Sequence, residues 1–141
     1  MEIWITTPQN VKIEYTSGKD AYPIRKVVTL NMPSEYNPKA KNHFAPPFPK
    51  RIAILQGFEI QYGRLEDEGG QEVFHPSQHW LRQMEIVVQN HGWNVVENSG
   101  GIVSQGPDVE VIAGLRDNSG GDPPDDGFVG SVHVSALIIY P

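Results

Sequence analysis

The sequence predicts an all-β protein, folded as an antiparallel β-sandwich of about eight short strands with a Pro-rich arm. Valine and isoleucine number 26, against six leucines and six alanines. β-Branched side chains pack well on a pleated surface and lose rotamer freedom in a helix, so this composition favours strands. Glycine and proline add another 26 residues, and they gather between the apolar stretches, where a sandwich needs its turns.

The chain of 141 residues has the length of one domain, and a domain of that size buries about 68–70% of its unfolded surface. No stretch approaches the roughly 18 apolar residues that span a bilayer, and residues 1–6 lack the features of a signal peptide. We therefore expect a soluble protein without a membrane span. The sequence does not indicate the compartment, and an extracellular or virion-associated location is compatible with it. The absence of cysteine excludes disulfides and thiol chemistry.

The N-terminal third contains three candidate strands and the arm. Residues 3–6 and 11–15 are short alternating segments, with Val11, Ile13 and Tyr15 expected to face inward, and residues 24–30 form the third. Residues 33–49 hold five prolines and little periodicity, which predicts an extended linker or arm. We accordingly divide the chain into residues 1–47, with the N-terminal strands and the arm, and residues 48–141, the sandwich.

The central part of the chain contains one strong strand and one ambiguous segment. Residues 52–62 alternate, and Gly57 inside that pattern predicts a β-bulge. Residues 63–71 are hydrophilic and are expected to form a loop. Residues 77–90 suit either a helix capped by Ser77 or a strand, and the Ile86-Val87-Val88 ending with its β-rich context favours the strand.

Three further strands are expected toward the C-terminus. They cover residues 94–97, 109–113 and 132–140. In the last of them, Val132, Val134, Ala136, Ile138 and Tyr140 share one face. The opposite face changes from polar to apolar at Leu137 and Ile139, as in a central strand or a subunit contact.

The charge distribution argues against nucleic-acid binding. Residues 1–51 hold eight Lys/Arg and four Asp/Glu, a balance of +4, whereas residues 52–141 hold three and thirteen, a balance of −10. An acidic chain without a dense basic cluster lacks the groups that neutralise phosphates. The N-terminal third would pack either on its own acidic body or on a neighbouring subunit.

The acidic segment at residues 116–127 is a candidate cation site. Asp117, Asp122 and Asp125 supply hard oxygen ligands of the kind calcium requires. Their spacing does not match the Asp-x-Asp-x-Asp-Gly loop, and clusters of Asp, Gly and Pro are also typical of a long hairpin turn. We therefore expect no cofactor, with calcium as the alternative.

The sequence contains few signals of a transition-metal site or of a catalytic site. His75 and His79 would share a face only on a helix, and no third ligand is near them in sequence, so turn or surface histidines are the expectation. The chain has no Gly-x-Ser-x-Gly elbow, no cysteine and no phosphate-binding loop. We therefore expect a protein that is not an enzyme.

Aromatic residues near turns suggest a sugar site. Trp80 and Trp93 lie close to turn residues and polar side chains, and an aromatic face with planar hydrogen-bonding groups is suited to a sugar ring. The alternative is that either tryptophan fills the core. The candidate ligand-binding residues are Arg82, Trp93, Asp117, Asn118 and Asp122.

From Phe48 to Pro141 the chain resembles the small six-stranded β-sandwich of H-type lectins and discoidin-like C-terminal domains. The resemblance is carried by residues 48–55 leading to Gly57-Phe58, by residues 84–88 and by residues 134–138. It implies a homotrimer or hexamer that binds galactose-type sugars between subunits, with Arg82 and Trp93 as the counterparts of the family's arginine and aromatic residues. The family's aromatic-rich stretch is not clearly reproduced around Gly92-Trp93.

Two functions follow as expectations. The first is a non-enzymatic, oligomeric, lectin-like protein that binds carbohydrate, in which multivalency compensates for weak single sites. The alternative is a structural or assembly protein of a phage or secretion-type apparatus, in which the arm and the charge asymmetry mediate contacts between copies.

Overall fold

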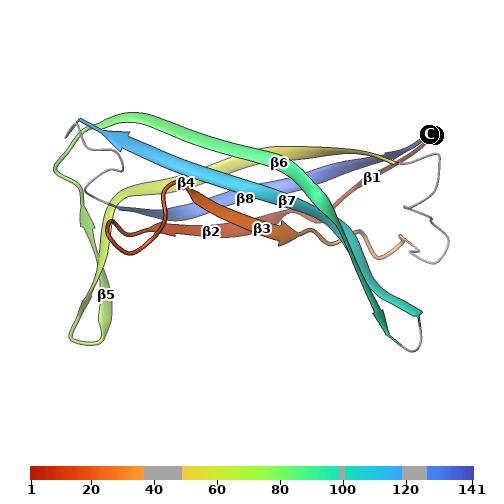
Figure 1. Ribbon diagram of the computed structural model, residues 1–141, viewed down its shortest axis with the longest axis horizontal. Coiled ribbons are helices and arrows are strands. Elements are labelled where there is room, and N and C mark those ends of the chain that lie inside the picture. The colour runs from red at the N-terminus through yellow and green to blue at the C-terminus, as the bar shows by residue number, and fades with distance from the viewer. Residues whose placement is uncertain (37–48, 99–100, 119–126) are drawn as a thin grey trace.

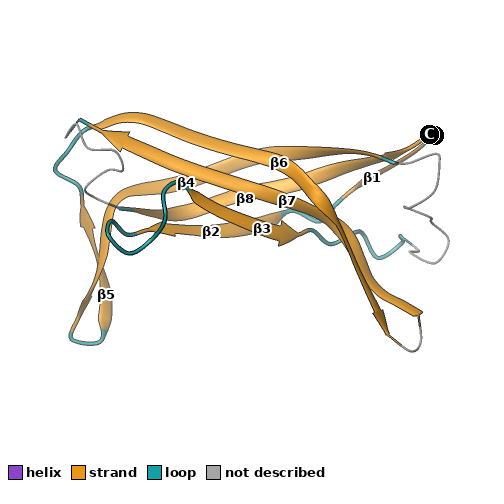
Figure 2. Ribbon diagram, in the orientation of Figure 1, coloured by secondary structure: helices purple, strands orange, loops and turns teal. Residues whose placement is uncertain are grey.

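The computed structural model describes residues 1–36, 49–98, 101–118 and 127–141, with the side chains of 94–98 and 101–105 left out. Every element in these ranges is a strand or a loop (Figure 2). The eight strands are β1 (Glu2–Ile5), β2 (Gln9–Tyr15), β3 (Ile24–Thr29), β4 (Lys50–Glu68), β5 (Gln71–Pro76), β6 (Leu81–Asn98), β7 (Gly101–Asp117) and β8 (Phe128–Tyr140). The predicted all-β class is confirmed.

The strands form two antiparallel sheets. In the first, which we call sheet A, β8 is central: β4 pairs along one side of it, and β1 and β2 pair with successive parts of the other side. Strand β5 extends this sheet from the end of β4. The second, sheet B, has the order β3-β7-β6. Figure 1 shows the two sheets lying along each other, with the β4–β5 hairpin projecting from one end.

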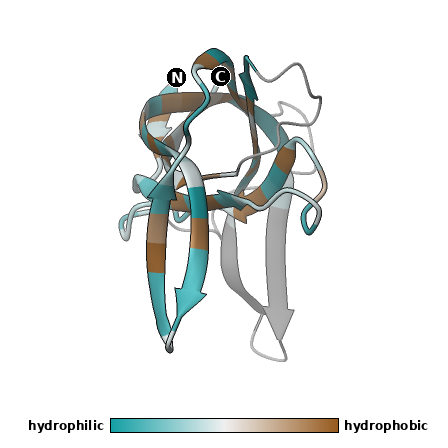
Figure 3. Ribbon diagram, turned by 90° about the vertical axis from the view of Figure 1, so that its left-hand side faces the viewer, coloured by the Kyte–Doolittle hydropathy of each residue, from teal (hydrophilic) through white to brown (hydrophobic). Residues whose placement is uncertain are grey.

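Side-chain hydrogen bonds connect the sheets at both of their edges. Asn90 Nδ2 of β6 donates to the Arg51 carbonyl oxygen of β4 over 2.7 Å. At the opposite edge, Lys26 Nζ of β3 donates to the Lys12 carbonyl oxygen of β2 over 2.6 Å. Viewed along its long axis, the molecule is therefore a flattened ring of strands rather than two independent layers (Figure 3).

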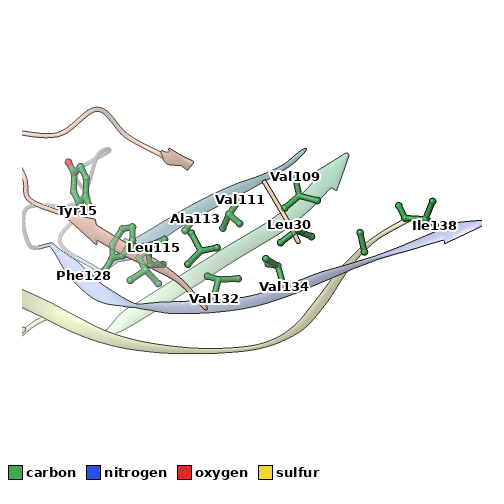
Figure 4. Close-up of a cluster of buried hydrophobic side chains, with 13 residues drawn as sticks. Tyr15, Leu30, Val109, Val111, Ala113, Leu115, Phe128, Val132, Val134 and Ile138 are labelled. Atoms are coloured by element: carbon green, nitrogen blue, oxygen red, sulfur yellow. The ribbon is translucent and has the colours of Figure 1, made fainter. Parts of the chain in front are cut away.

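The core lies between the sheets and follows the expected alternation. Val11, Ile13 and Tyr15 are buried, as are Val132, Val134, Ala136 and Ile138 of β8. Sheet B contributes Val109, Val111, Ala113 and Leu115, which face them (Figure 4). Most of the inward-facing side chains of β7 and β8 are β-branched or small. The two sheets can therefore pack closely and bury almost all of the side-chain surface between them.

Four strands are longer than the short strands expected, with 13 to 19 residues each. The bulge predicted at Gly57 is confirmed by a register shift between Leu55 and Gly57. The loop predicted at residues 63–71 is wrong: β4 continues to Glu68 and returns as β5 through a turn at Gly69 and Gly70. Both faces of this hairpin meet solvent, so its hydrophilic residues resemble a loop in sequence.

The choice of strand over helix at residues 77–90 is confirmed from Leu81 onward, where β6 begins. The N-terminal strands join both sheets, because β1 and β2 pair with β8 and β3 pairs with β7. Residues 37–48, which hold most of the Pro-rich arm and the division at residue 47, lie outside the described residues. In the described part of the chain, no helix is long and apolar enough to cross a membrane.

Candidate functional site

An exposed tryptophan lies in the loop that connects β5 to β6. Trp80 has a relative exposure of 80%, yet its backbone is fixed. The Trp80 amide donates to Asn118 Oδ1, and the Asn118 amide donates back to the Trp80 carbonyl oxygen, both over 3.1 Å. The indole therefore meets solvent while its attachment point is held in one geometry.

The segment before Trp80 is held in the same way. The Ser77 amide donates to the Tyr62 carbonyl oxygen over 3.0 Å, and the His79 amide donates to Ser77 Oγ over 3.1 Å. These bonds attach the connection between the two sheets to β4. A hollow of about 430 Å³ lies beside it, lined by Arg64, His75, Pro76, Gln78 and His79. Together with Trp80 and Asn118, these five residues make up what we call the Trp80 site.

The Trp80 site has the composition of a polar binding surface with one aromatic platform. Arg64, Gln78 and the two imidazoles offer planar hydrogen-bonding groups. The indole of Trp80, which follows His79 in the chain but does not line the hollow, offers an exposed apolar face. Such a combination suits a ligand that has both an apolar face and several hydroxyl groups.

Asp117 is the last residue of β7 and lies in the interior at the same end of the sandwich as the Trp80 site. It is buried, and the Tyr62 hydroxyl donates to its Oδ2. A buried carboxylate is costly unless it is hydrogen-bonded, so this contact explains why an acidic residue is tolerated there. Asp117 thus lies inside the fold rather than on its surface.

The structure places the predicted ligand-binding residues in two separate regions. Arg82 and Asn118 are exposed near Asp117, because Leu81 pairs with Asp117 at the start of β6. Trp93 is on the same strand but about 36 Å farther along, at roughly 3.3 Å per residue, and it packs against the core. Arg82 and Trp93 therefore do not meet within one chain. Asp122 and Asp125 lie outside the described residues, so calcium binding with Asp117 stays a prediction.

The opposite end of sheet A carries an exposed apolar surface. On β1, β8 and β4, residues alternating with the core side chains point outward, and the register places Ile5, Leu137 and Ile52 in one row. We define the outer isoleucine face as Ile3, Ile5, Ile52, Ile54, Leu137 and Ile139. Three of these isoleucines are exposed, Ile52 to 48%, and isoleucine is a residue that proteins usually bury.

Two tyrosines, Tyr36 and Tyr140, lie in the core beneath this face, and their hydroxyl groups are uncharged. Tyr36 Oη and Tyr140 Oη are 2.7 Å apart, and burial raises the pKa of both hydroxyls above the ordinary tyrosine value. Both therefore stay neutral at any physiological pH, and they add no charge that would oppose association at this end.

The hollow and its hairpin were missed by reasoning from sequence. Its residues Arg64 and His75 come from segments expected to form a loop and a turn, and they meet only because β4 and β5 pair. The Gly69-Gly70 dipeptide between two hydrophilic segments was the signal that could have indicated a hairpin.

The chain matches no family model, no curated protein and no solved structure. Its function is therefore inferred from its own residues and their geometry.

Proposed function

We propose that the protein is a non-enzymatic, oligomeric, lectin-like β-sandwich that binds carbohydrate at the Trp80 site. The observation that carries this proposal is the 80% exposed indole of Trp80, whose backbone is fixed and which follows His79, a residue that lines the polar hollow. A sugar ring stacks its C–H face on an indole while its hydroxyls bind planar polar groups. The resemblance of residues 48–141 to H-type lectins supports the same function.

Replacing Trp80 with alanine is expected to lower the affinity for sugar at least tenfold, because a central tryptophan in a binding site often contributes about 2 kcal/mol or more. Trp80→Phe keeps an aromatic face and is expected to retain most of the affinity. Binding is measured first on a glycan array with the wild-type protein and then by titration calorimetry with the best ligand. If the wild-type protein binds no sugar, carbohydrate recognition is excluded, and an unchanged affinity in Trp80→Ala would move the site elsewhere.

Self-association through the outer isoleucine face is the second part of the proposal, with a homotrimer or hexamer as the expected assembly. The face is apolar at its centre and carries one charge at its margin, Lys50, which pairs with Ile139 and is exposed. A second copy of the same surface can therefore pack on the centre without burying an unpaired charge. Several copies would present several Trp80 sites, and the avidity of the assembly would exceed the affinity of one site.

Ile52→Glu is expected to convert the oligomer into monomers, because it places a charge in the middle of this apolar contact. Val27→Glu is the matched control: Val27 is a β-branched residue of similar exposure, 47% against 48%, but it lies on sheet B. Light scattering coupled to size exclusion measures the mass of each variant. A monomeric wild-type protein, or equal masses for wild type and Ile52→Glu, would overturn this part.

A second candidate function is a structural or assembly protein of a phage or secretion-type apparatus. It is favoured by β1, which among the described strands pairs only with β8 and so offers an edge next to the outer isoleucine face. Repeated head-to-tail association at such an edge builds extended assemblies when the rotation between copies does not close a ring. Large assemblies that bind no sugar on the array would select this function over the first.

A further inference from the structure

Two carboxylates and an imidazole converge on the β4–β5 hairpin. His75 Nε2 lies 2.8 Å from Glu68 Oε1 and 3.5 Å from Glu66 Oε2. One ligand atom from each of the three residues lies within 4.8 Å of the others. We call Glu66, Glu68 and His75 the hairpin cluster. Its residues come from two strands of one hairpin, so the pairing of β4 with β5 brings the nitrogen to the oxygens.

The turn of the hairpin sets this arrangement. Gly69 and Gly70 both have positive φ, 63° and 87°, as a two-residue type I′ turn requires. The Gly70 amide also donates to Asp67 Oδ1 over 2.9 Å. Such turns fix the register and the strong right-handed twist of a two-stranded ribbon. Glu66 and Glu68 alternate onto one face of β4, on the side that His75 reaches from β5.

A neighbouring arginine orients one of the carboxylates. Arg64 Nε donates to Glu66 Oε1 over 2.7 Å, which leaves Oε2 as the oxygen turned toward His75. Groups that hold a ligating carboxylate in this way are common around metal ions. Residues 63–76 contain one arginine and four acidic residues, so the hairpin carries a net charge of −3 when His75 is counted as neutral. That surplus favours a divalent cation.

We propose that the hairpin cluster binds a divalent transition-metal ion of the Zn²⁺ type. Imidazole nitrogen with carboxylate oxygen is a donor set that Zn²⁺ accepts, whereas Ca²⁺ and Mg²⁺ prefer oxygen alone. Bonds of about 2.0–2.1 Å in a tetrahedron place two ligand atoms about 3.3–3.4 Å apart. The two distances from His75 Nε2, 2.8 and 3.5 Å, bracket that separation, and the ligand oxygens of Glu66 and Glu68 lie within 4.8 Å of each other. Rotation of the two carboxylate side chains would bring all three atoms to the ion. The partly exposed cluster leaves the fourth position to water.

The hairpin cluster shares His75 with the Trp80 site, and Arg64 contacts both, but metal binding is measured without sugar and is therefore tested separately from carbohydrate binding. Metal-free protein, prepared with a chelator, is titrated with Zn²⁺ by calorimetry and with Co²⁺ by visible absorption. We expect one ion per chain, with the d–d absorption of tetrahedral Co²⁺. His75→Gln and the double variant Glu66→Gln/Glu68→Gln are each expected to weaken binding at least tenfold, and Ca²⁺ is expected not to compete.

Two control variants separate ligation from general electrostatics. Glu72→Gln removes one negative charge from the same hairpin, half of what the double variant removes, but Glu72 pairs with Asp67 and lies on the other face. His79→Gln removes an exposed histidine outside the cluster. Both are expected to bind Zn²⁺ as the wild type does. Absence of Zn²⁺ binding, equal binding of Ca²⁺, or wild-type affinity in His75→Gln would overturn the proposal. So would a loss in Glu72→Gln as large as in the double variant.

Discussion

Gly130→Ala is expected to lower the free energy of unfolding by about 3 kcal/mol or more, because the added methyl group has no space. Gly130 lies in the centre of sheet A, paired with Ile13 on one side and Ile60 on the other. A Cβ atom there would come closer than 3.0 Å to the backbone of Glu59 and Ile60. Backbone atoms of a paired strand cannot rotate away, so the β4–β8 pairing itself would have to shift.

Gly57→Ala is the matched control for this substitution. Gly57 lies on β4, the strand that pairs with β8, but a Cβ atom added to it would meet nothing within 4 Å. Urea unfolding followed by far-ultraviolet circular dichroism measures both variants. Since domains are stable by only about 5–15 kcal/mol, Gly130→Ala should unfold at much lower urea than Gly57→Ala. Equal midpoints for the two variants would contradict the close approach of β4 and β8.

Much of the core was predictable because its pattern is local. Lys12 and Glu14 alternate with three buried residues of β2, and the same period of two runs along β8. What the sequence could not supply was the partner of each strand. Glu2 pairs with Tyr140 from the far end of the chain, and such pairings depend on the packing of whole sheets rather than on neighbouring residues.

The two tryptophans illustrate why the site was only partly predictable. Trp80 and Trp93 have similar turn residues around them, but the first is exposed and the second packs on the core. Along β6, Ile86 and Val88 pack on the core, and a register shift between Asn90 and Gly92 then turns the odd-numbered Trp93 inward. A β-bulge exchanges the faces of a strand, and Gly92, interpreted from the sequence as a turn residue, lies at the position of this one.

Ligand binding and self-association are proposed for opposite ends of sheet A. Tyr62 pairs with Phe128 next to the Trp80 site, whereas Ile52 pairs with Leu137 on the outer isoleucine face. Association through the second end would leave the first free for ligand, as an avidity mechanism requires. Ile52→Glu should therefore preserve the affinity of a single site while it abolishes multivalent binding.

Phe128→Ala is expected to cost about 3–5 kcal/mol, the usual range for removing a buried phenylalanine. Phe128 begins β8 with a relative exposure of 1%, and its ring stacks on that of Tyr15 at a centroid distance of 5.5 Å. The cavity left behind would lie beneath Tyr62 and Asp117, because Tyr62 pairs with Phe128. Phe58→Ala serves as the control, since Phe58 is 42% exposed and should lose only about 1 kcal/mol.

The same substitution separates stability from recognition. Because Phe128 supports the strand end that carries Tyr62, Phe128→Ala should loosen the Asp117 contact and the attachment of Asn118 to Trp80. The indole of Trp80 should then be more mobile, and its fluorescence anisotropy should fall. The measurement is made in a background where Trp4 and Trp93 are replaced by phenylalanine. Chemical unfolding of Phe128→Ala and Phe58→Ala gives the stability difference. Equal losses in both variants would mean that Phe128 is not the aromatic centre of this end of the core.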